Sequence, residues 1–500
     1  MKNFASIFCL YFLCSFSSFA SFDFNTNCKS AYEKIISLRF DEGLSLLKTE
    51  KTINPSNLIP YYIENYIDFL KLIISEDPVL FNSLKTNKDT RISKIENSDE
   101  KESPYYKYCL AEINLQWAFA RIKFKEYFNA ALEINKAYKL LEENEKEYPD
   151  FIPNHKGLGL LHSLIGTIPD EYKWTTKLIG ISGTISQGVS ELSAILAMAL
   201  KNDDYAYLKT ESIFLLTFIQ LNFQSNKDQA LILAKYLNDP SYTTLLNNNP
   251  LLCYAAASIC IKTGSNDKAI KILLARPSGA EYYPFYYLDY LTGVAKLNRL
   301  DFDSYKYLYS FLANFKGQNY IKAAYQKLAW YYLLNNNTSK YKEKINYVFT
   351  LGGTLVDEDS QALTEAKSNI IPNIRLLKAR LLSDGGYYQK AMDTLVEKKP
   401  SDFCVSTKDY LEYTYRLGRI YDEWGYDTKA IPYYELTIKN GSAFTYYFAA
   451  NSSLHLGLIY ENLKNNEKAK YYYELCSTMK NTEYKTSINQ KAKAGLNRIQ

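Results

Sequence analysis

Apolar residues recur every three or four positions along most of the chain, and short polar turns interrupt them at intervals. This spacing places the apolar side chains on one face of a helix. The pattern predicts pairs of helices joined by tight turns over residues 31–47, 105–138, 213–237, 253–274, 375–395, 415–441 and 454–480. Glycine (20) and proline (14) are too scarce for an all-β chain, which needs a turn every ~8–12 residues. The sequence therefore predicts an all-α protein.

Two of these pairs share one motif, Leu-Gly-x-Ile-Tyr, followed after a gap by Ala-x-x-x-Tyr. The motif contains Gly418, Ala430 and Tyr434 in the first copy, and Gly457, Ala469 and Tyr473 in the second. Glycine lets the returning helix approach closely, and the tyrosine one turn after the alanine fills the groove. One such pair cannot bury its own apolar face, so the pairs must stack on one another.

This motif resembles the tetratricopeptide repeat, a helix–turn–helix unit with small and aromatic residues at fixed positions. Weaker copies surround Ala391 and Ala269. The resemblance implies an α-solenoid, that is, a superhelix of stacked tetratricopeptide-like helical hairpins. Residues 153–192, and more loosely most of the chain, also resemble exported tetratricopeptide-repeat proteins of Bacteroidota-like bacteria and, more distantly, the tetratricopeptide-like family whose eukaryotic members act in inclusion-body clearance.

In a tetratricopeptide array the first helix of each pair lines the concave surface. The resemblance carries this role onto three groups of candidate partner-binding residues: Asn373, Leu376 and Arg380; Glu412, Tyr415, Arg419 and Asp422; and Asn451, Leu454, Leu458 and Glu461. Arg380 and Arg419 can hold a carboxylate bidentately, with Tyr415 as an aromatic platform. We expect a Tyr415→Ala, Arg419→Ala variant to fold and to lose its partner. The alternative is that these side chains are ordinary solvated helix surface.

Composition shifts divide the chain into five parts. Residues 1–20 form a signal peptide, and residues 21–104 hold degenerate helical repeats that end in a polar loop from about residue 85. Residues 105–200 form a helical hairpin followed by a glycine-rich block, and residues 201–350 hold degenerate repeats. A break at Gly352 and Gly353 then precedes the C-terminal repeats of residues 370–500.

The glycine-rich block, residues 153–192, departs from the repeat pattern. It holds six glycines, is interrupted by Pro169 and has Trp174 at its centre. Two interpretations remain open: the glycines allow tight helix crossings in a bent hairpin, or they form a ligand site. The first is favoured because glycine usually serves the backbone.

The N-terminus predicts export. Lys2 precedes an apolar run, and small residues at Ser18 and Ala20 suit cleavage before Ser21. Leu13 stands where a lipobox needs a small residue before Cys14, so lipidation is disfavoured. No later stretch is long and apolar enough to span a membrane. We therefore expect an exported protein in the periplasm or associated with the outer membrane, with no transmembrane span in the mature chain.

Charge and motif content exclude several classes of protein. The net charge is +5, with basic residues spread along the chain, which argues against nucleic-acid binding. No phosphate loop, zinc-protease or hydrolase motif occurs, and the six cysteines after residue 20 form no C-x-x-C pair. His155 and His162 have no third metal ligand nearby. The sequence thus predicts no enzyme, no cofactor and no metal site.

The remaining class is a binding protein. We expect a non-catalytic exported solenoid that binds a protein or peptide in the cell envelope. The alternative is a helical nutrient- or glycan-binding surface protein that partners an outer-membrane transporter, which the many tyrosines (47) would suit. The missing lipobox counts against this alternative.

Overall fold

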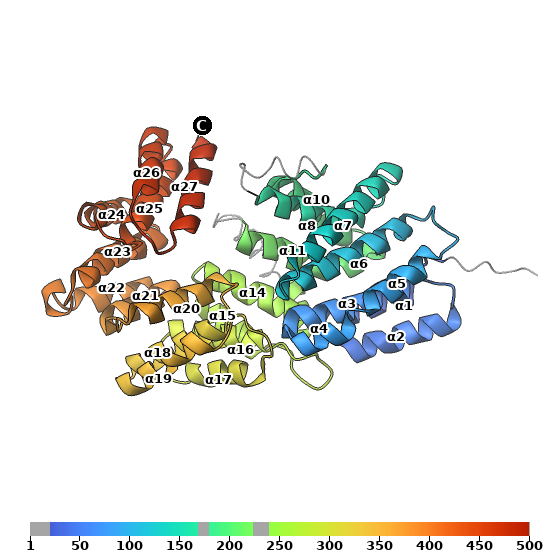
Figure 1. The fold of residues 1–500 in the computed structure, drawn as a ribbon, viewed down its shortest axis with the longest axis horizontal. Coiled ribbons are helices and arrows are strands. Elements are labelled where there is room, and N and C mark those ends of the chain that lie inside the picture. Colours follow the sequence, from blue (N-terminus) through green and yellow to red (C-terminus); the bar gives the residue numbers. More distant parts are fainter. Residues whose placement is uncertain (1–20, 169–179, 224–239, 500) are drawn as a thin grey trace, which may run out of the picture.

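The computed structural model describes residues 21–168, 180–223 and 240–499, and within these ranges it contains helices and no strand (Figure 1). The all-α prediction is confirmed. Three of the sequence predictions concern residues outside these ranges. They are the signal peptide of residues 1–20, the centre of the glycine-rich block with Pro169 and Trp174, and the second half of the hairpin expected over residues 213–237.

Most helices pack in pairs, and a short turn joins the two helices of every pair except α8 and α10, which residues 167–184 separate. These pairs are α1 (Thr26–Ile36) with α2 (Phe40–Ile53), α6 (Pro104–Lys123) with α7 (Tyr127–Glu147), α8 (Asn154–Gly166) with α10 (Ile185–Ala199), α14 (Pro250–Lys262) with α15 (Asn266–Leu274), α16 (Tyr287–Asn298) with α17 (Ser304–Asn314), α18 (Ile321–Leu334) with α19 (Thr338–Thr350), α21 (Ile374–Asp384) with α22 (Tyr388–Val396), α23 (Thr407–Glu423) with α24 (Asp427–Gly441), and α25 (Phe448–Asn462) with α26 (Asn466–Thr478).

The other helices connect or cap these pairs. They are α3 (Ile59–Ser75), α4 (Pro78–Leu84), α5 (Asn87–Glu96), the 3₁₀ helix η2 (Asp203–Leu208), α11 (Lys209–Asn222), α13 (Pro240–Asn248), α20 (Asp357–Ser368), the 3₁₀ helix η3 (Pro400–Asp402) and α27 (Lys485–Ile499). The last of these, α27, packs on both α25 and α26 and covers the end of the array.

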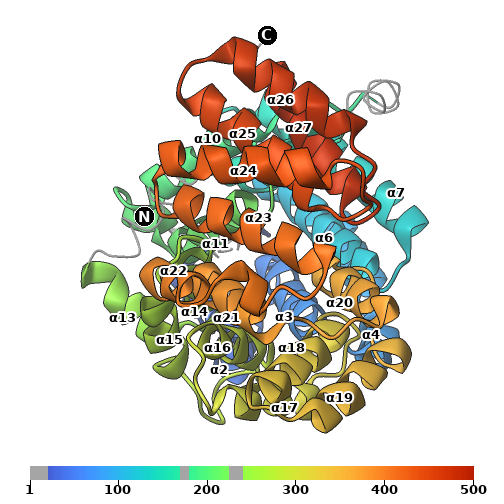
Figure 2. The same ribbon diagram turned by 90° about the vertical axis from the view of Figure 1, so that its left-hand side faces the viewer.

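The first helices of successive pairs form an inner layer, in which each contacts the next from α14 through α16, α18, α21 and α23 to α25, while α3 joins α1 to α6 in the N-terminal half. The second helices lie outside them. Figures 1 and 2 show the result as a curved superhelix, in which α23–α27 rise above α16–α19. The expected solenoid of stacked hairpins is therefore present.

The two C-terminal motifs pack as their spacing predicts. A Cβ atom added at Gly418 would lie 2.7 Å from the ring of Tyr434, and one added at Gly457 would lie 2.5 Å from the ring of Tyr473. Both tyrosines are fully buried. Gly425 turns the chain between α23 and α24 with a positive φ of 85°, which glycine adopts without strain.

The glycine-rich block is a close helix crossing between α8 and α10. A Cβ atom at Gly188 would lie 2.1 Å from the backbone oxygen of Gly159, so only glycine fits. His162, on α8, pairs with Glu191 of α10 at 2.7 Å, and His155 pairs with Glu145 of α7. This geometry supports the structural interpretation of these glycines.

Two predicted turns differ from the structure. The polar loop expected from residue 85 to residue 104 contains helix α5, which Ile92 and Ile95 anchor by burial and Lys88 anchors through an ion pair with Glu133. Most of its other residues are polar and exposed, so the sequence of this helix resembles that of a loop. In the helix pair predicted over residues 31–47, the turn lies before Phe40, which is the first residue of α2.

The inner helices of the N-terminal half converge on a buried charged cluster. Nζ of Lys156, on α8, lies 2.8 Å from Glu112 of α6 and 3.3 Å from Glu211 of α11. It also donates hydrogen bonds to Tyr32 of α1 and to Tyr66 of α3. Five helices thus share one network around a lysine that is 2% exposed.

Two further properties bear on the sequence predictions. No helix among the described residues has both the length and the apolar character needed to cross a membrane. The six described cysteines are unpaired, and all but Cys404 are buried, as small apolar residues are.

Candidate partner-binding site

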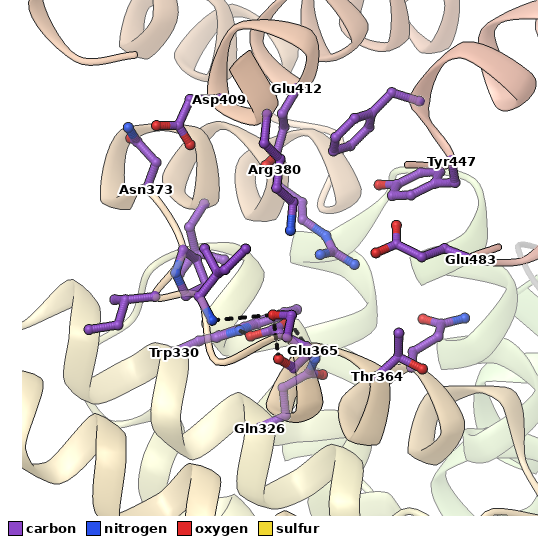
Figure 3. Close-up of a pocket in the computed structure, with 18 of the residues that line it drawn as sticks. Gln326, Trp330, Thr364, Glu365, Asn373, Arg380, Asp409, Glu412, Tyr447 and Glu483 are labelled. Atoms are coloured by element: carbon purple, nitrogen blue, oxygen red, sulfur yellow. Dashed lines mark hydrogen bonds between the residues drawn. The ribbon is translucent and has the colours of Figure 1, made fainter. Parts of the chain in front are cut away.

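A pocket of about 100 Å³ lies on the inner side of the superhelix, where the middle of the array meets the C-terminal repeats (Figure 3). Helices α18, α20, α21 and α23 form its walls, together with the start of α25 and the turn before α27. Its lining residues include Gln326, Trp330, Thr364, Glu365, Asn373, Arg380, Lys408, Asp409, Glu412, Tyr447, Glu483 and Tyr484.

Arg380 provides the pocket's central positive charge. Its guanidinium group lies over the indole of Trp330, 4.8 Å from the ring centroid, and Figure 3 shows it in the middle of the pocket. The only carboxylate within ion-pair distance among the described residues is that of Asp384, at 3.8 Å on the same helix. The side chain is 27% exposed. Arg380 is therefore positioned by stacking and left open to a further carboxylate.

Trp330 is held firmly in this position. Its indole N–H donates to Oε1 of Glu365 at 2.7 Å, and the side-chain amide of Gln326 donates to Oε2 of the same carboxylate at 2.7 Å. Each oxygen of Glu365 thus accepts one hydrogen bond. This carboxylate therefore holds the aromatic floor of the pocket, and it makes no ion pair with Arg380 among the described residues.

A second cation contacts the same indole. Nζ of Lys327 lies 3.7 Å from the Trp330 ring centroid. Burial, together with the charge of Arg380, lowers the pKa of Lys327 to about 7, against the opposing effect of Glu365 and more distant carboxylates. Trp330 thus carries two basic side chains, one of which titrates near neutral pH.

The opposite wall brings its own counter-charge. Arg416 donates to Glu412 at 3.0 Å and to the hydroxyl of Tyr447 at 3.3 Å. Burial raises the pKa of Glu483, although Lys408 opposes this shift. This wall is polar, and its carboxylate at Glu412 is already paired.

Two of the predicted binding residues, Asn373 and Arg380, line this pocket. Asn373 caps α21, because its side-chain oxygen accepts from the backbone N–H groups of Arg375 and Leu376. Its amide N–H donates to the backbone oxygen of Phe403. Asn373 therefore has a structural role at the rim of the pocket.

The expectation that Tyr415 forms an exposed aromatic platform is wrong. Tyr415 is 3% exposed and belongs to the C-terminal apolar core. Its hydroxyl accepts a hydrogen bond of 2.6 Å from Asn451, another predicted binding residue. The two side chains join α23 to α25, because the first helices of adjacent repeats pack closely at this point.

Arg419 and Asp422 also join these helices, through His455. The Nδ1 atom of His455 lies 2.8 Å from Asp422, and its Nε2 atom lies 2.6 Å from Arg419. Burial and the charge of Arg419 lower the pKa of His455, which is therefore neutral at pH 7. Burial raises the pKa of Asp422, but the hydrogen bonds from His455 and Tyr434 and the charge of Arg419 outweigh this effect and lower it to about 2.

Glu461 serves the next junction in the same way. Its carboxylate accepts from the hydroxyl of Tyr473 and binds the guanidinium group of Arg498, on α27, through both oxygens. The predicted strip of Arg380, Tyr415 and Arg419 is thus not a continuous exposed surface. Arg380 faces the pocket, and the other two tie repeats together.

Sequence reasoning missed the residues that surround Arg380. Lys327 and Trp330 are three residues apart on α18, a spacing that predicts a shared helix face. That helix carries no recognisable repeat motif, so nothing in the sequence placed it beside α21. Among the described residues, no group of three histidine, cysteine or acidic side chains could hold a metal ion.

Comparison with known proteins bears on the C-terminal end of the chain. A family model described as a tetratricopeptide repeat matches residues 411–439 and 450–483, which span α23–α24 and α25–α26. These are the two segments in which the repeated motif was recognised. No curated protein matches the chain. The match is confined to these two helix pairs, and repeats of this kind suggest protein–protein interaction.

Proposed function

We propose that this protein is a non-catalytic scaffold that binds a partner protein, and that a carboxylate of the partner enters the pocket at Arg380. The observation that carries the proposal is the position of the Arg380 guanidinium group. It is stacked on Trp330, it faces the pocket, and its nearest carboxylate among the described residues is 3.8 Å away. A partly buried arginine with available N–H donors is well suited to bind a carboxylate through two parallel hydrogen bonds.

The neighbouring carboxylates support this assignment. Glu365 is occupied by Trp330 and Gln326, and Glu412 is paired with Arg416. Neither makes an ion pair with Arg380 among the described residues. Lys327, on the same indole, adds a second positive charge nearby. An acidic side chain or a C-terminal carboxylate in the pocket therefore meets Arg380, and Lys327 adds positive charge when it is protonated.

We further propose that the protein acts in the cell envelope after export. The support is the N-terminal sequence alone, in which a basic residue, an apolar run and small residues before Ser21 have the order of a cleavable signal. The partner would then be an envelope protein. Fractionation of cells that express the tagged chain tests the location separately from the binding.

The binding proposal is tested with a displayed library of random peptides, selected on the purified protein at pH 7. We expect the selected peptides to share an Asp, a Glu or a free C-terminal carboxylate. Arg380→Ala should weaken their binding by at least tenfold, which is about 1.4 kcal/mol. Lys429→Ala, on the exposed outer face of α24, is the matched control and should bind as the wild type does.

Circular dichroism of both variants checks that they are folded. Selected peptides without any acidic preference would contradict the proposal, and so would an Arg380→Ala variant that binds them with wild-type affinity.

A further inference from the structure

The pocket at Arg380 carries a negative charge on the wall that faces the guanidinium group. Glu483, in the turn between α26 and α27, lines the pocket and is half-buried. Figure 3 shows its carboxylate turned toward the guanidinium group of Arg380. The two groups do not form an ion pair, since the only carboxylate within that distance of Arg380 among the described residues is that of Asp384. Opposite charges thus face each other across the pocket without contact.

The turn that bears Glu483 is anchored to the rest of the fold. The backbone N–H of Thr482 donates to the backbone oxygen of Thr445, in the loop before α25, at 3.0 Å. The side-chain amide of Asn481, which is 1% exposed, donates to the backbone oxygen of Glu483 at 2.9 Å. The position of Glu483 on the pocket wall is therefore set by the packing of α25 and α27.

Arg380 is also fixed on its own side of the pocket. Its guanidinium group is stacked on Trp330, whose indole N–H donates to Glu365. A direct ion pair with Glu483 would require the guanidinium group to leave this ring or the anchored turn to move. The space between the two charges is therefore open to a ligand that brings a partner for each of them.

A partner carboxylate alone fits this space poorly. On Arg380 it lies in the same pocket as Glu483, which carries the same charge. Like charges repel, and water and salt screen this repulsion less in a partly buried pocket than at an open surface. A positive group beside the partner's carboxylate removes the repulsion and gives Glu483 an ion pair.

We propose that the partner segment carries a basic side chain, lysine or arginine, next to the carboxylate that binds Arg380, and that Glu483 binds this side chain. The inference rests on the proposed function, because it needs the partner's carboxylate on Arg380. The basic group donates to the carboxylate of Glu483, and its hydrocarbon stem packs against the rings of Trp330 and Tyr447, which line the pocket. The pocket thus recognises a pair of opposite charges and not a single acidic residue.

Two other roles of Glu483 predict different results. If Glu483 competes with the partner for Arg380, removal of its charge strengthens the binding of acidic peptides; if it is protonated, removal of the charge changes nothing. Burial raises the pKa of Glu483, while Lys408 and a hydrogen bond from the backbone of Tyr447 oppose this shift. Binding is therefore measured at pH 8, far above the usual range of a carboxyl group. Lys327, with a pKa of about 7, is mostly neutral at this pH and contributes little.

The experiment uses a displayed peptide library with a fixed central glutamate and random neighbours, selected on the full chain at pH 8. We expect lysine or arginine to be enriched close to the glutamate. The best lysine peptide is then compared with a version that has norleucine in place of lysine, which keeps the hydrocarbon stem and removes the charge. Isothermal titration should show that the wild type binds the norleucine peptide about tenfold more weakly.

The variant Glu483→Gln assigns this charge contact to one residue. It should bind the lysine peptide about tenfold more weakly than the wild type does, and it should no longer distinguish the lysine peptide from the norleucine peptide. Glu474→Gln, on the exposed face of α26 and outside this pocket, is the matched control and should bind both peptides as the wild type does. Circular dichroism checks that both variants are folded.

Three results would overturn the inference: no basic residue enriched beside the glutamate, equal binding of the two peptides by the wild type, or tighter binding of acidic peptides by Glu483→Gln. A preference for lysine that survives in Glu483→Gln would overturn it as well. The wild-type comparison does not depend on the folding of the variant.

The variant Arg380→Ala separates this inference from the proposed function. If Arg380→Ala loses the peptides and Glu483→Gln does not discriminate between them, the proposed function stands and only the inference falls. If the library yields no binding peptide, or if Arg380→Ala binds as the wild type does, both fall.

Discussion

The ring of Tyr434 covers Gly418 so closely that a Cβ atom added to the glycine would lie 2.7 Å from Cδ1 of the ring. Real Cβ atoms do not approach other carbons to this distance, so either the ring or the helix must move. The tyrosine is fully buried and its hydroxyl donates to Asp422 at 2.8 Å, which fixes the ring in place. The contact therefore sets the separation of α23 and α24.

We expect Gly418→Leu to destabilise the protein by about 1–3 kcal/mol through overpacking. The measurement is urea denaturation followed by circular dichroism. Gly353→Ala is the control, because an added Cβ atom there would meet its nearest neighbour at 3.6 Å, an ordinary contact. Equal stability of the two variants would show that α23 and α24 can separate without cost.

Stability should fall in acid through Asp422. Its pKa is about 2 in the folded state and near 3.8 in an unfolded chain, so the ionised carboxylate stabilises the fold above pH 4. That contribution, on the order of 2 kcal/mol, is lost as the pH falls from 4 to 2. Asp422→Asn should be less stable than the wild type at pH 7 and should lose less stability over this range. Thermal unfolding at several pH values measures both effects, and parallel curves for the two proteins would contradict the assignment.

Removal of Lys156 should be severe. Lys156→Met leaves Glu112 and Glu211 buried without a counter-charge, and breaking a buried ion pair in this way costs about 3–5 kcal/mol. The triple variant Lys156→Met, Glu112→Gln, Glu211→Gln removes all three charges and should recover part of that loss. Lys470→Met removes an exposed partner of Glu474 and should cost less than ~1 kcal/mol. Chemical denaturation compares the three, and a mild effect of Lys156→Met would mean that the cluster is hydrated.

Binding of acidic peptides should depend on pH through Lys327. Burial and the charge of Arg380 lower its pKa to about 7, although Glu365 and more distant carboxylates oppose this shift. The side chain therefore gains its positive charge as the pH falls from 8 to 6. An acidic peptide at Arg380 should bind more tightly at pH 6 than at pH 8. Lys327→Met should bind more weakly at pH 6 and should lose this dependence, as isothermal titration can measure. A dependence that survives in Lys327→Met would assign the titration to another group.

The variant Tyr415→Ala, Arg419→Ala should not fold normally, contrary to the expectation from sequence. Tyr415 is buried, and truncation of a buried aromatic residue costs about 3 kcal/mol or more. Tyr415→Phe, which removes only the hydrogen bond from Asn451, should cost about 1 kcal/mol. Denaturation curves of Tyr415→Ala and Tyr415→Phe test this difference. If Tyr415→Ala were as stable as the wild type, Tyr415 would have to be solvent-exposed, as the sequence had suggested.

The C-terminal repeats were predictable because their signal is local. Gly418, Tyr434, Gly457 and Tyr473 lie within two short segments, and their contacts follow from helix spacing alone. The assignment of Tyr415 to the exposed surface failed because the repeat pattern identifies the inner helix but not the residues that the next repeat covers. Its hydrogen bond comes from Asn451, in that next repeat.

Neither the pocket at Arg380 nor the Lys156 cluster could be found from the sequence. Arg380 meets Trp330 because α21 packs on α18, although α19 and α20 lie between them in the sequence. Lys156 meets Tyr32 across 124 positions of sequence. Contacts of this kind depend on the curvature of the whole superhelix, and no spacing of residues along one helix encodes it. Buried polar residues such as Glu112 and Glu211 were therefore indistinguishable from surface ones.

The cluster around Lys156 limits how the length of this array can change. In an ordinary solenoid each repeat contacts only its neighbours, so a unit can be added or lost without harm to the rest. Here α1, α3, α6, α8 and α11 each contribute a side chain to one charge network. Deletion of any of these helices would leave buried charged groups on the other helices without one of their partners. The N-terminal half should therefore unfold as one cooperative unit with a fixed number of helices, and only the repeats beyond it can vary in number.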